Sequence, residues 1–185
     1  MGTRGRRNQT LKQFEEPILL SNIDKVKALA VEKNLYNGDV LDIEQLIEEI
    51  SHEAPVDAQI SIEKIPMENY LSGSLSYENG RWIMKVNSKQ HINRQRFTLA
   101  HELAHYILHK DKNTEFKDST FFRGNNMDSL EYMANDYASA LLMPDDKVIG
   151  YINDGVRKLD DLASKFEVSV AAMKYKVEKL GYKVR

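Results

Sequence analysis

Two histidines and a glutamate stand in the middle of an unusually apolar stretch, FTLAHELAHYILH, at residues 97–109. Its apolar and aromatic residues fall on every side of a 3.6-residue helix, which predicts a buried helix rather than an amphipathic one. An unpaired polar group in an apolar interior costs on the order of 1–3 kcal/mol, and an unpaired charge costs far more. The fold must therefore provide specific partners for His101, Glu102 and His105.

The spacing of these side chains suits metal binding. His101 and His105 are four residues apart, so they project from one helix face and both imidazoles can reach one ion. Glu102 lies about 60° around the helix from His105, a direction that suits a general base better than a ligand. The alternative is a pair of core histidines that hydrogen-bond to backbone or carboxylate groups.

A catalytic zinc needs a third protein ligand from elsewhere in the chain. Candidates downstream are His109, Asp111, Glu115, Asp118, Asp128, Glu131 and Asp136. His109 is too far along a straight helix to share an ion with His101. Glu131 is better placed, because Ala134 and Ala138 follow it at helical spacing and would let its helix approach closely. Glu131 also fits the last position of a capping box that opens at Asp128, so a purely structural role stays open.

The surrounding pattern predicts elements that could hold such a site. Residues 21–36 and 41–51 show helical spacing. From residue 59 the pattern alternates, which predicts a small antiparallel sheet ending in a hairpin that turns at Asn79-Gly80. The buried helix follows directly.

The second half of the chain begins with a polar stretch, residues 110–126, which predicts a long loop. A helix capped by Asp128 and stopped by Pro144 comes next. Two short helices about the sequence EVS then end at Gly181. We expect one α+β domain over residues 21–185.

Composition narrows the possible functions. The 185 residues are 42% hydrophobic and 29% charged, with a formal net charge of -2, as in an ordinary globular protein. The absence of cysteine excludes disulfides, a thiol nucleophile and cysteine-based metal sites, so a metal here must use histidine and carboxylate. Nothing predicts export or a membrane span, so we expect a cytoplasmic protein.

Both ends of the chain raise the question of nucleic-acid binding. Residues 1–20 hold several arginines without an apolar period, which predicts a mobile tail, with a nucleic-acid-binding arm as the disfavoured alternative. Residues 155–185 have the outline of a helix-turn-helix. Its cations are Lys174, Lys176, Lys179, Lys183 and Arg185. Against DNA binding, four apolar side chains of the second helix need burial: Val170, Met173, Val177 and Leu180. We therefore expect this segment to pack against the rest of the domain, and to take part in partner recognition, rather than to read DNA.

The stretch RQRFTLAHELAHYILH, followed by EYMANDYASALLMP, resembles the paired signature of the ImmA/IrrE family of zinc metallo-endopeptidases. The resemblance runs from about residue 22 to residue 179. It implies a zincin-like domain in which His101, His105 and Glu131 bind Zn²⁺ and Glu102 is the general base.

The resemblance also implies a substrate. Members of the family cleave regulatory proteins, so a helix-turn-helix repressor of a mobile element, a phage or a stress response is expected, one encoded nearby being an obvious choice. In zincin-like enzymes an edge strand holds the extended peptide, and here RWIMKVN, residues 81–87, would be that strand. Tyr106, His109 and Tyr137 could serve as a second oxyanion donor, but packing roles are commoner for all three. The rival interpretation is a non-proteolytic regulator or toxin–antitoxin component, with a structural zinc and C-terminal helices that bind DNA or a partner.

Overall fold

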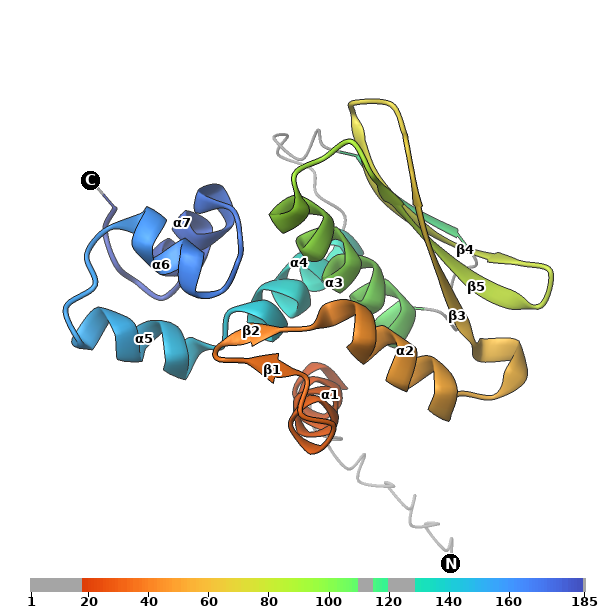
Figure 1. Cartoon of the computed structure of the whole chain (residues 1–185), viewed down its shortest axis with the longest axis horizontal. Coiled ribbons are helices and arrows are strands. Elements are labelled where there is room, and N and C mark those ends of the chain that lie inside the picture. The colour runs from red at the N-terminus through yellow and green to blue at the C-terminus, as the bar shows by residue number, and fades with distance from the viewer. Residues whose placement is uncertain (1–17, 110–114, 120–128, 185) are drawn as a thin grey trace, which may run out of the picture.

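The computed structural model describes residues 18–109, 115–119 and 129–184. Its helices are α1 (Ile18–Glu32), α2 (Ile43–Glu53), the short 3-10 helix η1 (Val56–Ala58), α3 (Ile92–His109), α4 (Ser129–Leu142), α5 (Asp145–Asn153), α6 (Leu159–Lys165) and α7 (Val170–Lys179). Its strands are β1 (Tyr36–Asn37), β2 (Val40–Leu41), β3 (Ile60–Ile65), β4 (Leu71–Glu78), β5 (Arg81–Asn87) and β6 (Glu115–Ser119). Figure 1 shows α3 and α4 in the centre, with the larger sheet on one side and α5, α6 and α7 on the other.

The larger sheet has the strand order β3-β5-β4-β6. Its hairpin turns where the sequence predicts, because Asn79 and Gly80 both have positive φ angles, 52° and 80°, as a two-residue hairpin turn of the favoured twist requires. The prediction of an antiparallel sheet is correct for β4 with β5, but wrong for β3, which pairs with β5 in parallel. The antiparallel pairing of β4 with β6 was not predicted. Alternation in β3 predicts a strand but carries no information about which neighbour it takes.

The stretch RWIMKVN was expected at the edge of the sheet, and this prediction is wrong. It forms β5, which has β3 on one side and β4 on the other, so its backbone groups already pair within the sheet. Trp82, Met84 and Val86 are buried, which confirms that they pack in the core. Within the described residues, the edges of this sheet are β3 and β6.

The long loop expected over residues 110–126 is also interrupted. β6 lies within it and pairs antiparallel with the outer edge of β4. Its sequence, EFKDS, has no sustained apolar alternation, so it forms because β4 offers an open row of backbone donors and acceptors. Residues 110–114 and 120–128, including the expected cap Asp128, lie outside the described residues.

The N-terminal helices follow the predicted pattern. α1 begins at Ile18, so it includes the last three residues assigned to the basic tail, while residues 1–17 lie outside the described residues. α2 is capped by Asp42, whose carboxylate accepts a hydrogen bond from the backbone N–H of Gln45 at 3.1 Å. The short β1–β2 hairpin between these helices was not predicted.

Helix α3 is buried as its sequence predicts. Leu99, Ala100, Leu103 and Ala104 are fully buried, and the polar residues His101, Glu102 and His105 are buried with them. α4 packs along α3, and the small side chains of its buried face, Ala134 and Ala138, permit this close approach, as expected. Among the described residues, no helix has the length and apolar character that crossing a membrane would need.

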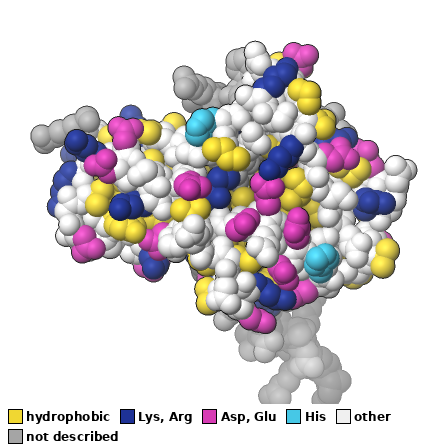
Figure 2. Space-filling model, viewed as in Figure 1, with side chains coloured by type: hydrophobic (Ala, Val, Ile, Leu, Met, Phe, Trp, Pro, Cys, Tyr) yellow, Lys and Arg dark blue, Asp and Glu magenta, His cyan; other side chains and the backbone are white. Residues whose placement is uncertain are grey.

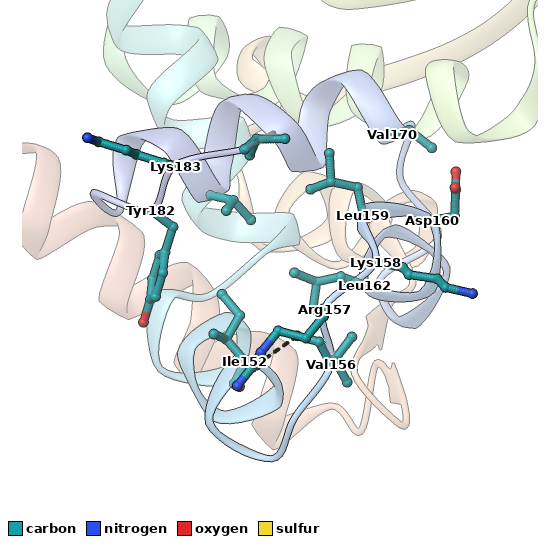
Figure 3. Close-up of a pocket in the computed structure, with 12 residues that line it drawn as sticks. Ile152, Val156, Arg157, Lys158, Leu159, Asp160, Leu162, Val170, Tyr182 and Lys183 are labelled. Carbon is teal, nitrogen blue, oxygen red and sulfur yellow. Dashed lines mark hydrogen bonds between the residues drawn. The ribbon is translucent and has the colours of Figure 1, made fainter.

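The C-terminal part contains α6 and α7, the expected helical pair, with Ser169 capping α7 by accepting a hydrogen bond from the N–H of Ala172 at 3.1 Å. α5 was not predicted, because Pro144 was interpreted from the sequence only as the end of α4. In the structure Pro144 also stands at the N-cap of α5. Met173 and Val177 are buried as expected, but Val170 is 42% exposed, so its predicted burial is wrong. Val170 instead borders a surface cavity (Figure 3).

Two lysines of α7 contact acidic side chains of neighbouring helices. Lys176 is buried and pairs with Asp145 of α5, and Lys179 pairs with Asp136 of α4. Figure 2 shows Lys and Arg intermixed with Asp and Glu over the visible face, not gathered into one basic field. Replacing Lys176 or Lys179 would therefore disturb packing as well as charge, which makes them unsuitable as probes of DNA binding.

Candidate metal centre

Three side chains from α3 and α4 converge at the middle of the molecule. Nε2 of His101 and Nε2 of His105 lie 3.0 Å apart. The carboxylate of Glu131 reaches both, with Oε2 at 3.2 Å from Nε2 of His101 and Oε1 at 3.3 Å from Nε2 of His105. Both histidines are buried, and Glu131 enters from the first turn of α4.

This arrangement fits a divalent metal ion of zinc size. Around a tetrahedral zinc with ligand distances of about 2.0–2.1 Å, neighbouring ligand atoms lie about 3.3 Å apart. The two Nε2 atoms are 3.0 Å apart, and each lies 3.2 or 3.3 Å from one of the two oxygens of Glu131, so these separations are close to that edge length. Imidazole nitrogens and a carboxylate oxygen all present lone pairs, so their convergence in a buried place is favourable only with a cation or a proton among them.

Asn135 orients one of the histidines. Its Oδ1 lies 3.2 Å from Nδ1 of His101. An amide oxygen only accepts hydrogen bonds, so with a metal ion in the site this contact would hold the imidazole proton on Nδ1, and the Nε2 lone pair would face the ion. Sequence reasoning missed Asn135, although its position one helical turn after Glu131 was a usable signal.

The charge state of Glu131 also suits a ligand. Burial alone would raise the pKa of its carboxyl, but the hydrogen bonds and charge supplied by His101 and His105 outweigh burial and lower the pKa to about 2. The side chain is therefore ionised at neutral pH, which is the form that metal binding requires.

Glu102 does not belong to this cluster of metal-binding atoms, and its carboxylate lies close to the sheet. It is fully buried beside β4, where Gly73 permits the close approach of strand and helix. A Cβ atom at position 73 would lie 2.4 Å from Cγ2 of Thr98 and 3.2 Å from Oε1 of Glu102. Gly73 was missed as well, although an isolated glycine within a strand is a sign of close backbone approach.

The other residues proposed from the sequence as metal ligands or oxyanion donors have other contacts or lie outside the described residues. Asp136, an alternative third ligand, pairs with Lys179 at 2.5 Å. The hydroxyl of Tyr106 donates to the backbone carbonyl of Ala58 at 2.6 Å, which fixes it as a packing residue. Tyr137 is buried, and burial raises the pKa of its phenol. Asp111 and Asp128 lie outside the described residues, as do the side chains of His109, Glu115 and Asp118.

The role of Asn135 predicts a graded effect on metal binding. We expect Asn135→Ala to weaken zinc affinity by about 10–100-fold while the fold is retained, because His101 keeps its position in α3 but loses the group that fixes its proton and ring orientation. Competition titration against a chromophoric chelator measures this affinity. An unchanged affinity would mean that packing alone orients His101. Asn153→Ala, on exposed surface at the end of α5, is a matched control.

Comparisons with known proteins agree with this geometry. Residues 57–178 match the model of the IrrE N-terminal-like domain, a family of peptidases. An uncharacterized immunity region protein 2 of Bacillus phage phi105 is 32% identical over 126 residues, which cover 65% of this chain and 77% of that protein.

Two further relatives carry descriptive names. The metallopeptidase ImmA of Bacillus subtilis is 31% identical over 60% of this chain and 64% of its own length. The radiation response metalloprotease IrrE of Deinococcus deserti is 32% identical over 54% of this chain and 37% of its own length. The matched region thus spans less than two thirds of each of these two relatives. The family match covers most of the chain and includes both helices of the metal centre, so the chain belongs to the IrrE N-terminal-like domain family of metallopeptidases.

Proposed function

We propose that this protein is a zinc-dependent endopeptidase that cleaves a regulatory protein. In this proposal His101, His105 and Glu131 hold the metal ion, and Glu102 is the general base. The observation that carries it is the convergence of two buried imidazole nitrogens and the carboxylate of Glu131, with neighbouring atoms no more than 3.3 Å apart. The buried carboxylate of Glu102 follows His101 directly in α3.

Zinc, when bound, would supply Lewis acidity toward a peptide carbonyl and make a water molecule easier to deprotonate. The protein supplies the remaining steps. The Glu102 carboxylate takes the proton of the attacking water and later donates it to the departing amine. Its full burial next to Gly73 of β4 restrains the carboxylate, so little reorganisation accompanies the proton transfer.

We propose a helix-turn-helix repressor as the substrate, on the strength of the family. The names of the relatives, which refer to an immunity region, to ImmA and to a radiation response metalloprotease, agree with a regulatory target. The rival interpretation, in which α6 and α7 bind DNA, is disfavoured because Lys176 and Lys179 pair with acidic side chains of α5 and α4.

The test is direct cleavage. Zinc-loaded protein, incubated with the repressor encoded by the neighbouring gene, should yield two discrete fragments, and a chelator should prevent their formation. Mass spectrometry of the fragments gives the cleaved bond. A heat-unfolded sample of the same repressor, run in parallel, exposes the bond if it is masked in the folded form. Intact repressor in both samples, with one zinc per chain confirmed, would contradict this choice of substrate.

A further inference from the structure

The metal ligands lie on a seam between α3 and α4 that continues beyond them. On α3 the spacing of three and four residues places Arg94, Phe97, His101 and His105 on one face. On α4 the same rule aligns Glu131, Asn135 and Ser139. Glu131 faces the histidines and Asn135 reaches His101, so the two stripes run along each other.

The far end of this seam opens into a pocket of about 300 Å³. It is lined by Arg94 and Phe97 of α3, Asn135 and Ser139 of α4, and Ser169, Ala171, Ala172 and Tyr175 at the start of α7. Asn135 therefore has two contacts: its amide oxygen holds His101, and its side chain forms part of the pocket wall. The pocket therefore adjoins the ligand His101 through Asn135.

The chemistry of the lining favours an apolar occupant. Phe97, Ala172 and Tyr175 supply aromatic and aliphatic surface. The charged member, Arg94, donates to Oγ of Ser72 in β4 at 2.8 Å. Ser139 is 4% exposed, and its hydroxyl has no hydrogen-bond partner among the described residues, so one polar group remains for an occupant.

We propose that this pocket receives a bulky apolar or aromatic side chain of the peptide substrate, close to the cleaved bond. This inference rests on the proposed function. Phe97 precedes His101 by one turn, a rise of about 6 Å, and an extended peptide advances about 3.3 Å per residue. The side chain in the pocket therefore belongs to a residue within about three positions of the cleaved bond. α7, whose outline suggested DNA binding, instead closes a specificity pocket.

A larger cavity of about 600 Å³ lies elsewhere. Its lining residues all fall between positions 152 and 184, in and around α5, α6 and α7 (Figure 3). Because none of these lining residues belongs to α3 or α4, that cavity is not continuous with the metal ligands. The smaller pocket is thus the better candidate for recognising residues next to the cleaved bond.

A binding experiment tests the pocket without requiring catalysis. We expect N-acetyl-phenylalanine amide, added to ¹⁵N-labelled zinc-loaded protein, to shift the backbone amide signals of Ser139, Ala172 and Tyr175, whereas N-acetyl-glycine amide leaves them in place. Ala171→Trp, made at an exposed position of the lining, should fill the pocket and abolish the shifts. Ala28→Trp, at an exposed position of α1, should retain them. The proposal fails if the phenylalanine probe leaves these signals unmoved or shifts them equally in Ala171→Trp.

A cleavage experiment tests the same pocket through specificity. With a randomised peptide mixture, we expect one position within about three residues of the cleaved bond to favour bulky apolar side chains by about tenfold or more, since burial of such a side chain is worth at least this factor. Ala171→Trp should shift that preference to glycine, alanine or serine at unchanged zinc content, and Tyr175→Ala, which removes a wall, should weaken it.

The two experiments separate the pocket from the proposed function. Cleavage without any such preference, or a preference unaltered in Ala171→Trp, overturns the pocket assignment and leaves the peptidase proposal standing. If the phenylalanine probe binds in the pocket but no peptide is cleaved by fully zinc-loaded protein, the endopeptidase proposal fails, and with it the assignment of the pocket to a substrate.

Discussion

Glu102→Gln should keep one zinc per chain and lose peptide cleavage by roughly a hundredfold to ten-thousandfold. The amide preserves the shape and most contacts of the carboxylate, but it cannot accept the proton of the attacking water, and a positioned base of this kind contributes roughly 10²–10⁴-fold. The metal should remain because the ligand atoms that converge in the site belong to His101, His105 and Glu131, and not to Glu102.

Elemental analysis and a cleavage assay on the same preparation measure both quantities. Glu63→Gln, an exposed carboxylate of β3, provides a matched control that should behave as the parent protein. If Glu102→Gln still cleaves at the parent rate with zinc bound, Glu102 is not the base, and the assigned catalytic role is wrong.

Glu131→Ala should have the opposite signature, with loss of the metal itself. Removing the carboxylate leaves two imidazole ligands, so zinc stoichiometry should fall well below one per chain. Stability in zinc should fall too. A ligand present at about 1,000 times its dissociation constant stabilises the folded state by about 4 kcal/mol, and the variant loses most of that contribution. Chemical unfolding with and without added zinc measures this difference independently of catalysis.

Asp136→Asn is the matched control for Glu131→Ala. Asp136 lies on the same helix and carries the same charge, but it pairs with Lys179, so this variant should keep its zinc. Should Glu131→Ala instead retain one zinc per chain, Glu131 is only a helix-capping residue and another carboxylate, such as Asp128, completes the site.

The local features of this protein could be predicted from its sequence. Apolar residues on all sides of residues 97–109 required a buried helix, and α3 is buried. The Asn79-Gly80 pair determined the hairpin turn, because few other residues adopt two successive positive φ angles. The four-residue spacing of His101 and His105 placed both imidazoles on one face of that helix. These features depend on residues a few positions apart, so periodicity and backbone preference are enough to predict them.

The partnerships between distant segments were decided only by the tertiary structure. β3 takes the free side of β5, and β6 forms from a polar segment because β4 has an open edge. Lys176 and Lys179 meet acids that lie 31 and 43 positions earlier. Gly73 lies beside Glu102, and Asn135 beside His101, only after the sheet and α4 have packed on α3. Strand order and side-chain pairing of this kind follow from which surfaces remain uncovered when the elements pack, a property of the folded chain that no local pattern encodes.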